Sequence, residues 1–158
     1  ANHSSNLDPI VLGCASFRRV YFVAKEELFR NPLASFFLRR LGAFPLRRGE
    51  GDKEAVKRIF SLLREGKVVG LFPEGTRNRG ELGDFQRGAL KLLLHAGVPV
   101  VVAGIKGTYE SLPRDKKIPR PFPIRVSFSS PFEVKGWSVE EVEKKIREEM
   151  EALLSEND

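Results

Sequence analysis

Short apolar runs alternate along the chain with longer segments in which apolar residues recur every three or four positions. The short runs predict strands and the longer periodic segments predict helices. Strands are expected at 20–23, 44–46, 68–72, 98–105 and 124–128. Helices are expected at 9–17, 32–41, 52–65 and 85–96. A last helix is expected from 138 onwards, and its apolar side consists of Val139, Val142, Ile146, Met150 and Leu153. Several strands are apolar throughout, which is typical of strands buried on both faces.

The ends of the predicted helices carry residues that commonly start or stop a helix. Ser138 and Glu141 form a capping-box pattern, and Gly42, Gly66 and Gly97 follow three helices. Because strands and helices alternate, we expect an α/β fold, a single domain with a mainly parallel or mixed sheet covered by helices on both faces. The active site is then expected where strands end, at their carboxyl edge.

The chain is long enough to bury a core without a disulfide or a metal. Residues 1–158 are expected to form one domain, with a further N-terminal segment missing, because Ala1 directly precedes the first motif. The single cysteine, Cys14, lies in an apolar run and excludes an internal disulfide. No metal site is expected, because His3, His95 and Cys14 lack a ligand-like spacing.

The net charge of +6 is unevenly distributed. Residues 1–120 hold 22 Lys or Arg against 12 Asp or Glu, whereas residues 121–158 hold 5 against 9. A basic body favours anionic partners such as phospholipid headgroups, phosphorylated metabolites or a coenzyme, although a merely solvated basic surface is the alternative. Nucleic acid is disfavoured, because the basic residues are dispersed and no recognition motif occurs.

No segment resembles a transmembrane helix, since the most apolar stretch, 89–105, is interrupted by polar residues, Gly and Pro. No signal peptide is visible. The helix expected at 32–41 carries Phe36 and Phe37 beside two arginines. This pattern fits a helix that dips into an anionic bilayer, and it fits a core-facing helix equally well.

His3 and Asp8 are the first candidates for chemistry. An imidazole titrates near neutral pH and can take a proton from an alcohol, and a carboxylate on its other nitrogen orients it. Two alternatives stay open. In the first, Asp8 merely caps the following helix and His3 has no role in chemistry. In the second, Ser4 or Ser5 is a nucleophile that becomes acylated.

A second motif, Phe72-Pro73-Glu74-Gly75-Thr76-Arg77, follows a predicted strand. Its Pro and Gly predict a turn, and Arg77 offers the planar fork of donors that suits a phosphate. Glu74 is expected either to accept a hydrogen bond from a substrate hydroxyl or to hold Arg77. An ordinary turn with a surface ion pair is the alternative.

Together these motifs resemble the glycerolipid acyltransferase family, which includes the 1-acylglycerol-3-phosphate (lysophosphatidate) acyltransferases. The resemblance covers about residues 2–107 and includes four blocks in the family's order, at 2–8, 42–48, 72–77 and 98–104. It implies catalysis by His3, oriented by Asp8, without an acyl-enzyme. It also implies an acceptor-phosphate site made of Arg47, Glu74, Gly75, Thr76 and Arg77, with Arg48 as the alternative to Arg47. Lys106, just after the fourth block, is a further candidate for a phosphate contact, and a simply solvated lysine is the alternative.

The resemblance implies transfer of a fatty acyl group from acyl-coenzyme A or acyl-carrier protein to the free hydroxyl of 1-acylglycerol 3-phosphate, giving phosphatidate. It implies no cofactor beyond this co-substrate. Family members touch the membrane, so we expect peripheral contact with an anionic membrane at its cytoplasmic face. They normally have sequence before the first block, often helices that engage the membrane.

Two rival functions remain at this point. An acyl-thioester hydrolase would use water in place of the acceptor alcohol. A non-enzymatic membrane-binding module would use the basic surface and the helix expected at 32–41.

Overall fold

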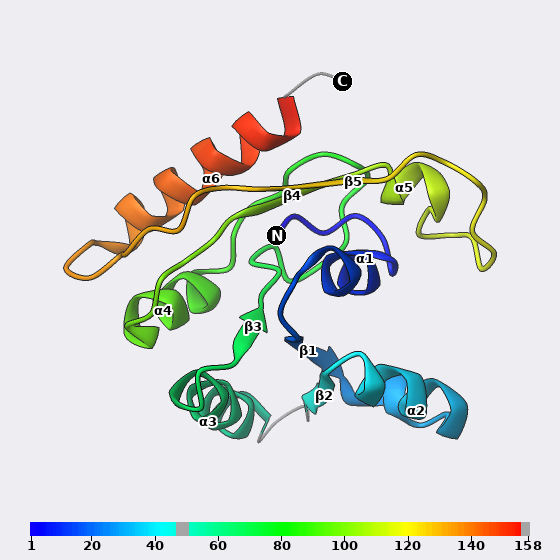
Figure 1. Ribbon diagram of the computed structural model, residues 1–158, viewed down its shortest axis with the longest axis horizontal. Helices are drawn as coiled ribbons and strands as arrows, with labels where there is room; N and C mark the ends of the chain where they lie inside the picture. Colours follow the sequence, from blue (N-terminus) through cyan, green and yellow to red (C-terminus); the bar gives the residue numbers. More distant parts are fainter. Residues whose placement is uncertain (47–50, 156–158) are drawn as a thin grey trace. The chain divides into compact units, whose positions relative to one another are not determined.

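The computed structural model describes residues 1–46 and 51–155 (Figure 1). The helices are α1 (Asp8–Ala15), α2 (Pro32–Arg40), α3 (Gly51–Arg64), α4 (Arg87–Ala96), α5 (Thr108–Ser111) and α6 (Val139–Ser155), with a 3₁₀ turn η1 (Glu26–Phe29). The strands are β1 (Val20–Lys25), β2 (Ala43–Leu46), β3 (Val68–Gly70), β4 (Ala103–Lys106) and β5 (Arg125–Phe128). The chain forms two compact units: residues 1–12 with 72–158 make unit 1, and residues 13–71 make unit 2.

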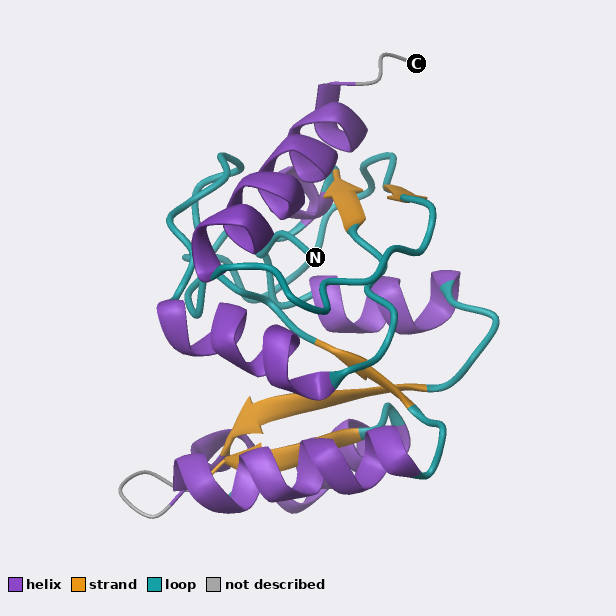
Figure 2. Cartoon of the chain, turned by 90° about the vertical axis from the view of Figure 1, so that its left-hand side faces the viewer, coloured by secondary structure: helices purple, strands orange, loops and turns teal. Residues whose placement is uncertain are grey.

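Unit 2 contains a parallel sheet with the strand order β2–β1–β3. Parallel strands need a crossover connection. The helix α2 lies in the connection from β1 to its neighbour β2, and α3 lies in the connection from β2 to β3 on the other side of β1. The helix α2 packs against β2, and α3 packs against both β2 and β3. Figure 2 shows these strands as adjacent arrows with helices beside them. The parallel sheet and the helices on it confirm the α/β class that the sequence predicts.

Unit 1 is built around α4, α6 and the strand β4. The apolar side of α6 predicted from its periodicity is the side that is buried. It packs against α4 and β4, and the resulting core consists of Phe85, Leu90, Val102, Val134, Val142, Ile146, Met150 and Leu153. Because this close-packed core lies against β4, the backbone of that strand is held rigidly in place.

The capping box predicted at the start of α6 is confirmed. The backbone N–H of Glu141 donates to Ser138 Oγ at 3.1 Å, and the backbone N–H of Ser138 donates to Glu141 Oε2 at 2.7 Å. The hydrogen bonds from Ser138, first from its backbone and then from its hydroxyl, lower the pKa of the Glu141 carboxyl. At the C-terminal end of another helix, α4, Gly97 ends the helix in the left-handed conformation, as predicted.

Several expected boundaries are wrong. The apolar run 98–105 is a strand only from Ala103 to Lys106, and it pairs antiparallel with β5 in a two-stranded sheet of its own. The run before it forms an isolated bridge between Val100 and Phe132. The strand expected at 68–72 ends at Gly70, and its residues are half-buried. The short helix α5 and the 3₁₀ turn η1 were not predicted, because a single turn has too few residues to show a period.

None of the helices within the described residues has the length and apolar character needed to cross a bilayer.

Candidate active site

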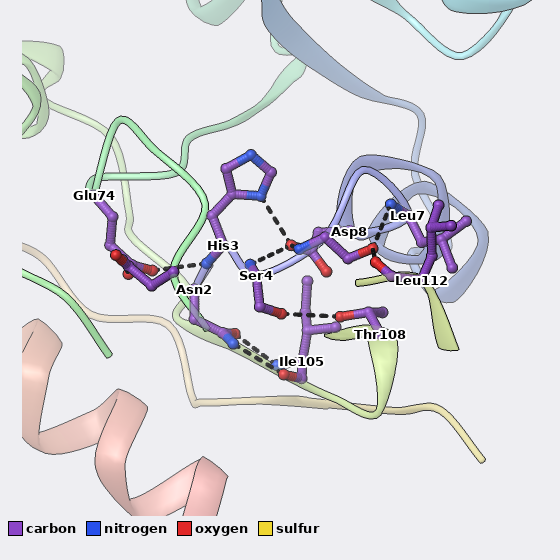
Figure 3. Close-up of polar contacts among 11 residues, drawn as sticks. Asn2, His3, Ser4, Leu7, Asp8, Glu74, Ile105, Thr108 and Leu112 are labelled. Atoms are coloured by element: carbon purple, nitrogen blue, oxygen red, sulfur yellow. Dashed lines mark hydrogen bonds and ion pairs between the residues drawn. The ribbon is translucent and has the colours of Figure 1, made fainter. Parts of the chain in front are cut away.

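His3 and Asp8 form a hydrogen-bonded pair in unit 1. The Nδ1 atom of His3 lies 2.8 Å from Asp8 Oδ2, within hydrogen-bonding distance (Figure 3). The His3 ring also stacks on Phe72, with the ring centroids 4.5 Å apart. Its side chain is 19 % exposed, whereas that of Asp8 is fully buried. One ring nitrogen is therefore bound to the carboxylate, and Nε2 lies on the opposite edge of the ring.

Asp8 holds more than the imidazole. Its Oδ2 atom also accepts the backbone N–H groups of Ser4 at 2.7 Å and Ser5 at 2.8 Å. Asp8 is the first residue of α1, and its side chain turns back toward the residues that precede the helix. Asp8 therefore does more than cap a helix, because its carboxylate also holds the imidazole of His3. Among the described residues, the buried Oδ1 atom has no hydrogen-bond partner.

The residues around His3 are tied to β4 and α5 (Figure 3). The side-chain amide of Asn2 donates to the carbonyl of Ile105 at 2.9 Å, and its oxygen accepts the N–H of Ile105 at 2.7 Å. These two hydrogen bonds hold the start of the motif against β4, because the side-chain amide of Asn2 pairs with both the carbonyl and the N–H group of Ile105.

The two serines of the motif are structural. The Ser4 hydroxyl lies 3.2 Å from that of Thr108, and the Ser5 hydroxyl donates to the carbonyl of Leu112 at 2.8 Å. Both serines are buried. These contacts and the burial of both hydroxyls disfavour an acylated serine at either position.

Glu74 supports His3 from the other side. Its side chain is only 1 % exposed, and its Oε1 atom accepts the backbone N–H of His3 at 2.7 Å. Its Oε2 atom accepts the N–H of Gly83 at 2.9 Å and the side-chain amide of Asn78. The carbonyl of His3 in turn accepts the backbone N–H of Asn78 at 2.9 Å. Glu74 thus holds the backbone of His3 in place.

This arrangement differs from the two roles expected for Glu74. Both carboxylate oxygens are engaged within the protein, so the side chain is placed to position His3, and no hydrogen bond or ion pair joins it to Arg77 within the described residues. Gly83 is needed here for a steric reason. A Cβ atom at this position would lie 2.2 Å from Asn78 Nδ2 and 3.0 Å from Glu74 Oε2.

Replacing Glu74 by glutamine is expected to lower kcat by about 10- to 100-fold with little change in KM, because it shifts the His3 imidazole, the side chain expected to act as the base. The NH₂ group of the glutamine must face either the N–H of His3 or the donors of Gly83 and Asn78. Two hydrogen-bond donors then point at each other, and the free energy of unfolding falls by about 1–3 kcal/mol. Steady-state kinetics and thermal unfolding measure the two effects. Glu81→Gln, at an exposed glutamate of the same loop, is the control. An increase in acceptor KM at constant kcat would instead assign Glu74 to the acceptor.

The other predicted site residues fall into three groups. Gly75 and Thr76 are exposed and Arg77 is half-buried, all in the turn after Phe72. Within residues 1–46 and 51–155, the guanidinium of Arg77 has no hydrogen-bond or ion-pair partner. Lys106 ends β4, one residue after the Ile105 backbone that binds Asn2. Arg47 and Arg48 lie outside the described residues.

Sequence reasoning missed the residues that hold the site together. Asn78, Gly83 and Thr108 lie far from His3 in the sequence, and their types are common in loops and turns. A buried carboxylate must find hydrogen-bond donors, but the burial of Glu74 is known only from the structure, so the sequence contains no signal for these residues. The described residues contain no group of three or more His, Cys, Asp and Glu side chains that would hold a metal ion.

A comparison with protein families gives a match to the Acyltransferase family over residues 1–106. The chain belongs to this family. It is 35 % identical over 106 residues to the 1-acyl-sn-glycerol-3-phosphate acyltransferase of Bacillus subtilis, which corresponds to 66 % of this chain and 53 % of that protein. It is 35 % identical over 117 residues to the chloroplastic 1-acyl-sn-glycerol-3-phosphate acyltransferase BAT2 of Brassica napus, covering 72 % of this chain and 33 % of that one.

A solved structure also matches. The 1-acyl-sn-glycerophosphate acyltransferase of Thermotoga maritima aligns with a TM-score of 0.77 and 28 % identity, over 99 % of this chain and 66 % of that one. The fold and the family expected from the resemblance are thereby confirmed. The chain spans about half the length of its Bacillus subtilis relative.

Proposed function

We propose that this acyltransferase moves a fatty acyl group from a thioester, acyl-coenzyme A or acyl-carrier protein, to the free hydroxyl of 1-acylglycerol 3-phosphate, giving phosphatidate. The observation that carries the proposal is the His3–Asp8 pair, in which one nitrogen is held by a buried carboxylate and the other faces away from it. The names of the matched relatives support this acceptor. The reaction would take place at the cytoplasmic face of an anionic membrane.

In the proposed mechanism His3 acts as the general base. Its Nε2 atom takes the proton of the acceptor hydroxyl while the hydroxyl oxygen attacks the thioester carbonyl. Asp8 keeps Nδ1 protonated and stabilises the imidazolium that forms. When the tetrahedral intermediate collapses, the C–S bond breaks and the imidazolium returns its proton to the departing thiolate. An ester and a free thiol result, and no acyl-enzyme is formed.

Incubation with palmitoyl-coenzyme A, with and without lysophosphatidate, tests the proposal. Thiol release and phosphatidate formation are followed together. We expect thiol release that depends on lysophosphatidate and equals the phosphatidate formed. Release at an undiminished rate without acceptor would make the protein a hydrolase. If palmitoyl-coenzyme A gives no release, the same assay with palmitoyl-acyl-carrier protein identifies the donor, and failure with both would reject the transfer.

Arg77 is proposed to bind the acceptor's phosphate. Replacing Arg77 by alanine is expected to raise the KM for lysophosphatidate roughly 10- to 100-fold and to change kcat little, because a charge-assisted hydrogen bond is worth about 1.5–3 kcal/mol. Initial rates over a range of lysophosphatidate concentrations measure this. Arg79→Ala, at an exposed arginine two residues further on, is the charge-matched control. An unchanged KM in the Arg77 variant would remove this residue from the phosphate site.

A further inference from the structure

Residues 113–124, here called the proline-rich loop, connect α5 to β5 and expose large apolar side chains. Ile118 is 82 % exposed, Phe122 46 % and Ile124 39 %. In Figure 1 the loop extends from the end of α5 and returns to β5. Three bulky apolar side chains exposed within seven consecutive positions cost solvation free energy, and such an apolar patch commonly marks an interaction surface.

The same loop is strongly basic. Arg114, Lys116, Lys117 and Arg120 are exposed, and Asp115 is the only acidic residue among 113–124. The Nζ atom of Lys116 lies 3.8 Å from Asp115 Oδ2, with both side chains largely exposed. A solvent-exposed ion pair at this distance contributes little to stability, so Lys116 is available to other partners. Four basic residues against one acidic residue give the loop a net positive charge around its apolar side chains.

The loop is held in place at both ends. At its base, the N–H of Arg120 donates to the carbonyl of Ser111 at 2.8 Å, and the Ser111 hydroxyl donates to the carbonyl of Arg120 at 2.9 Å. Near its end, the backbone of Pro123 packs against Gly107, where a Cβ atom would lie 1.9 Å from the Pro123 carbonyl oxygen. Four prolines within residues 113–123 further restrict the backbone. Little entropy is therefore lost when the loop binds a surface.

Hydrogen bonds connect the segment that precedes the loop to the residues around the His3–Asp8 pair. The hydroxyl of Thr108, the first residue of α5, lies 3.2 Å from that of Ser4. The carbonyl of Leu112, directly before the loop, accepts the Ser5 hydroxyl. Ser4 and Ser5 in turn donate their N–H groups to Asp8. A surface bound by the loop is thus held at a set position relative to the His3–Asp8 pair, all within unit 1.

We propose that the proline-rich loop docks the protein on an anionic phospholipid bilayer. Ile118 and Phe122 enter the boundary between headgroups and acyl chains, and Lys116 and Lys117 bind the anionic headgroups around them. The charge of the loop favours an anionic bilayer over a neutral one, and exposed Ile and Phe side chains gain from an apolar interior. The inference rests on the proposed function, because a membrane-resident acceptor must reach His3.

Co-sedimentation with vesicles tests the docking. The probes are vesicles of phosphatidylcholine alone and of phosphatidylcholine with phosphatidylglycerol. We expect binding only to the anionic vesicles, weakened at least tenfold by Ile118→Ser with Phe122→Ser and similarly by Lys116→Gln with Lys117→Gln, since each charge contributes about fivefold. Lys53→Gln with Lys57→Gln, which removes the same charge from exposed positions of α3, should bind as the parent protein does.

Two results of this vesicle assay would overturn the proposal. One is unchanged binding to anionic vesicles by both loop variants. The other is loss of binding in Leu33→Ser with Phe36→Ser on α2 while the loop variants bind normally, which would assign docking to that helix. Because Ile118 and Phe122 are exposed, these variants should keep the parent's unfolding temperature, and the two-lysine variant tests the loop independently. Binding of acyl-carrier protein that depends on the loop, without vesicle binding, would also reject the membrane.

Turnover separates this inference from the proposed function. With a short-chain lysophosphatidate and a short-chain acyl-coenzyme A, both monomeric in water, the loop variants should match the parent protein. With lysophosphatidate embedded in anionic vesicles, their rate should fall in proportion to the lost binding. Absent turnover of the soluble substrates by the parent protein would reject the proposed function, while loop-dependent vesicle binding would still support the docking surface.

Discussion

Replacement of His3 by alanine is expected to lower kcat by about 10²- to 10⁴-fold while the fold survives. The imidazole is the group proposed to take the acceptor's proton, and its removal leaves water as the base. The side chain is 19 % exposed, so little core packing is lost and the unfolding temperature should change little. Initial rates of phosphatidate formation at saturating substrates, with thermal unfolding beside them, measure both.

The chain contains a matched control for this change. His95 lies on α4, is exposed, and its Nδ1 atom lies 2.7 Å from the carbonyl of Lys91 in its own helix. His95→Ala should therefore retain parent activity. Full activity in the His3 variant would reject general-base catalysis by His3, whatever the effect of the other substitutions.

Replacement of Asp8 by asparagine is expected to reduce kcat about 10³- to 10⁴-fold, as for the orienting carboxylate of a serine protease. The shape is kept, but the charge that stabilises an imidazolium is lost. The neutral amide also faces three donors, the His3 ring and the N–H groups of Ser4 and Ser5, which converge on Oδ2. Asparagine is preferred to alanine, because alanine would leave all three donors without a partner in a buried place.

The double variant sharpens this test. If Asp8 acts through His3, the variant that carries both His3→Ala and Asp8→Asn should be no slower than His3→Ala alone, because the base that Asp8 orients is already gone. Multiplicative losses would show that Asp8 contributes independently of His3. Asp84→Asn, at an exposed aspartate without a hydrogen bond among the described residues, is the charge-matched control.

Local patterns determined most of the elements. The last helix was predicted from its capping box and from the spacing of Val142, Ile146 and Met150, and each of these features is present. Helix periods and caps depend on residues within one or two turns, so they can be read along the chain. The pair His3 and Asp8 is equally local, five positions apart, and one turn before a helix brings them together.

Which strands pair with each other was harder to predict from the sequence. The apolar run 98–105 predicts a buried strand, but no local signal says that its second half pairs antiparallel with β5. Strand pairing depends on which distant segment completes the ladder, and apolar runs look alike whatever their neighbour. The expectation of a mainly parallel sheet therefore holds for β1, β2 and β3 only.

The sequence by itself determined the residue types that carry the candidate chemistry, the α/β class and the family. Only the tertiary structure decided what holds His3 in place. Glu74 reaches its N–H across 71 positions, Asn2 reaches Ile105 across 103, and Ser5 reaches Leu112 across 107. Buried polar groups must find partners, and the partners are set by which backbone groups the fold leaves free nearby. Such contacts have no period and no fixed spacing, so they appear only once the chain is folded.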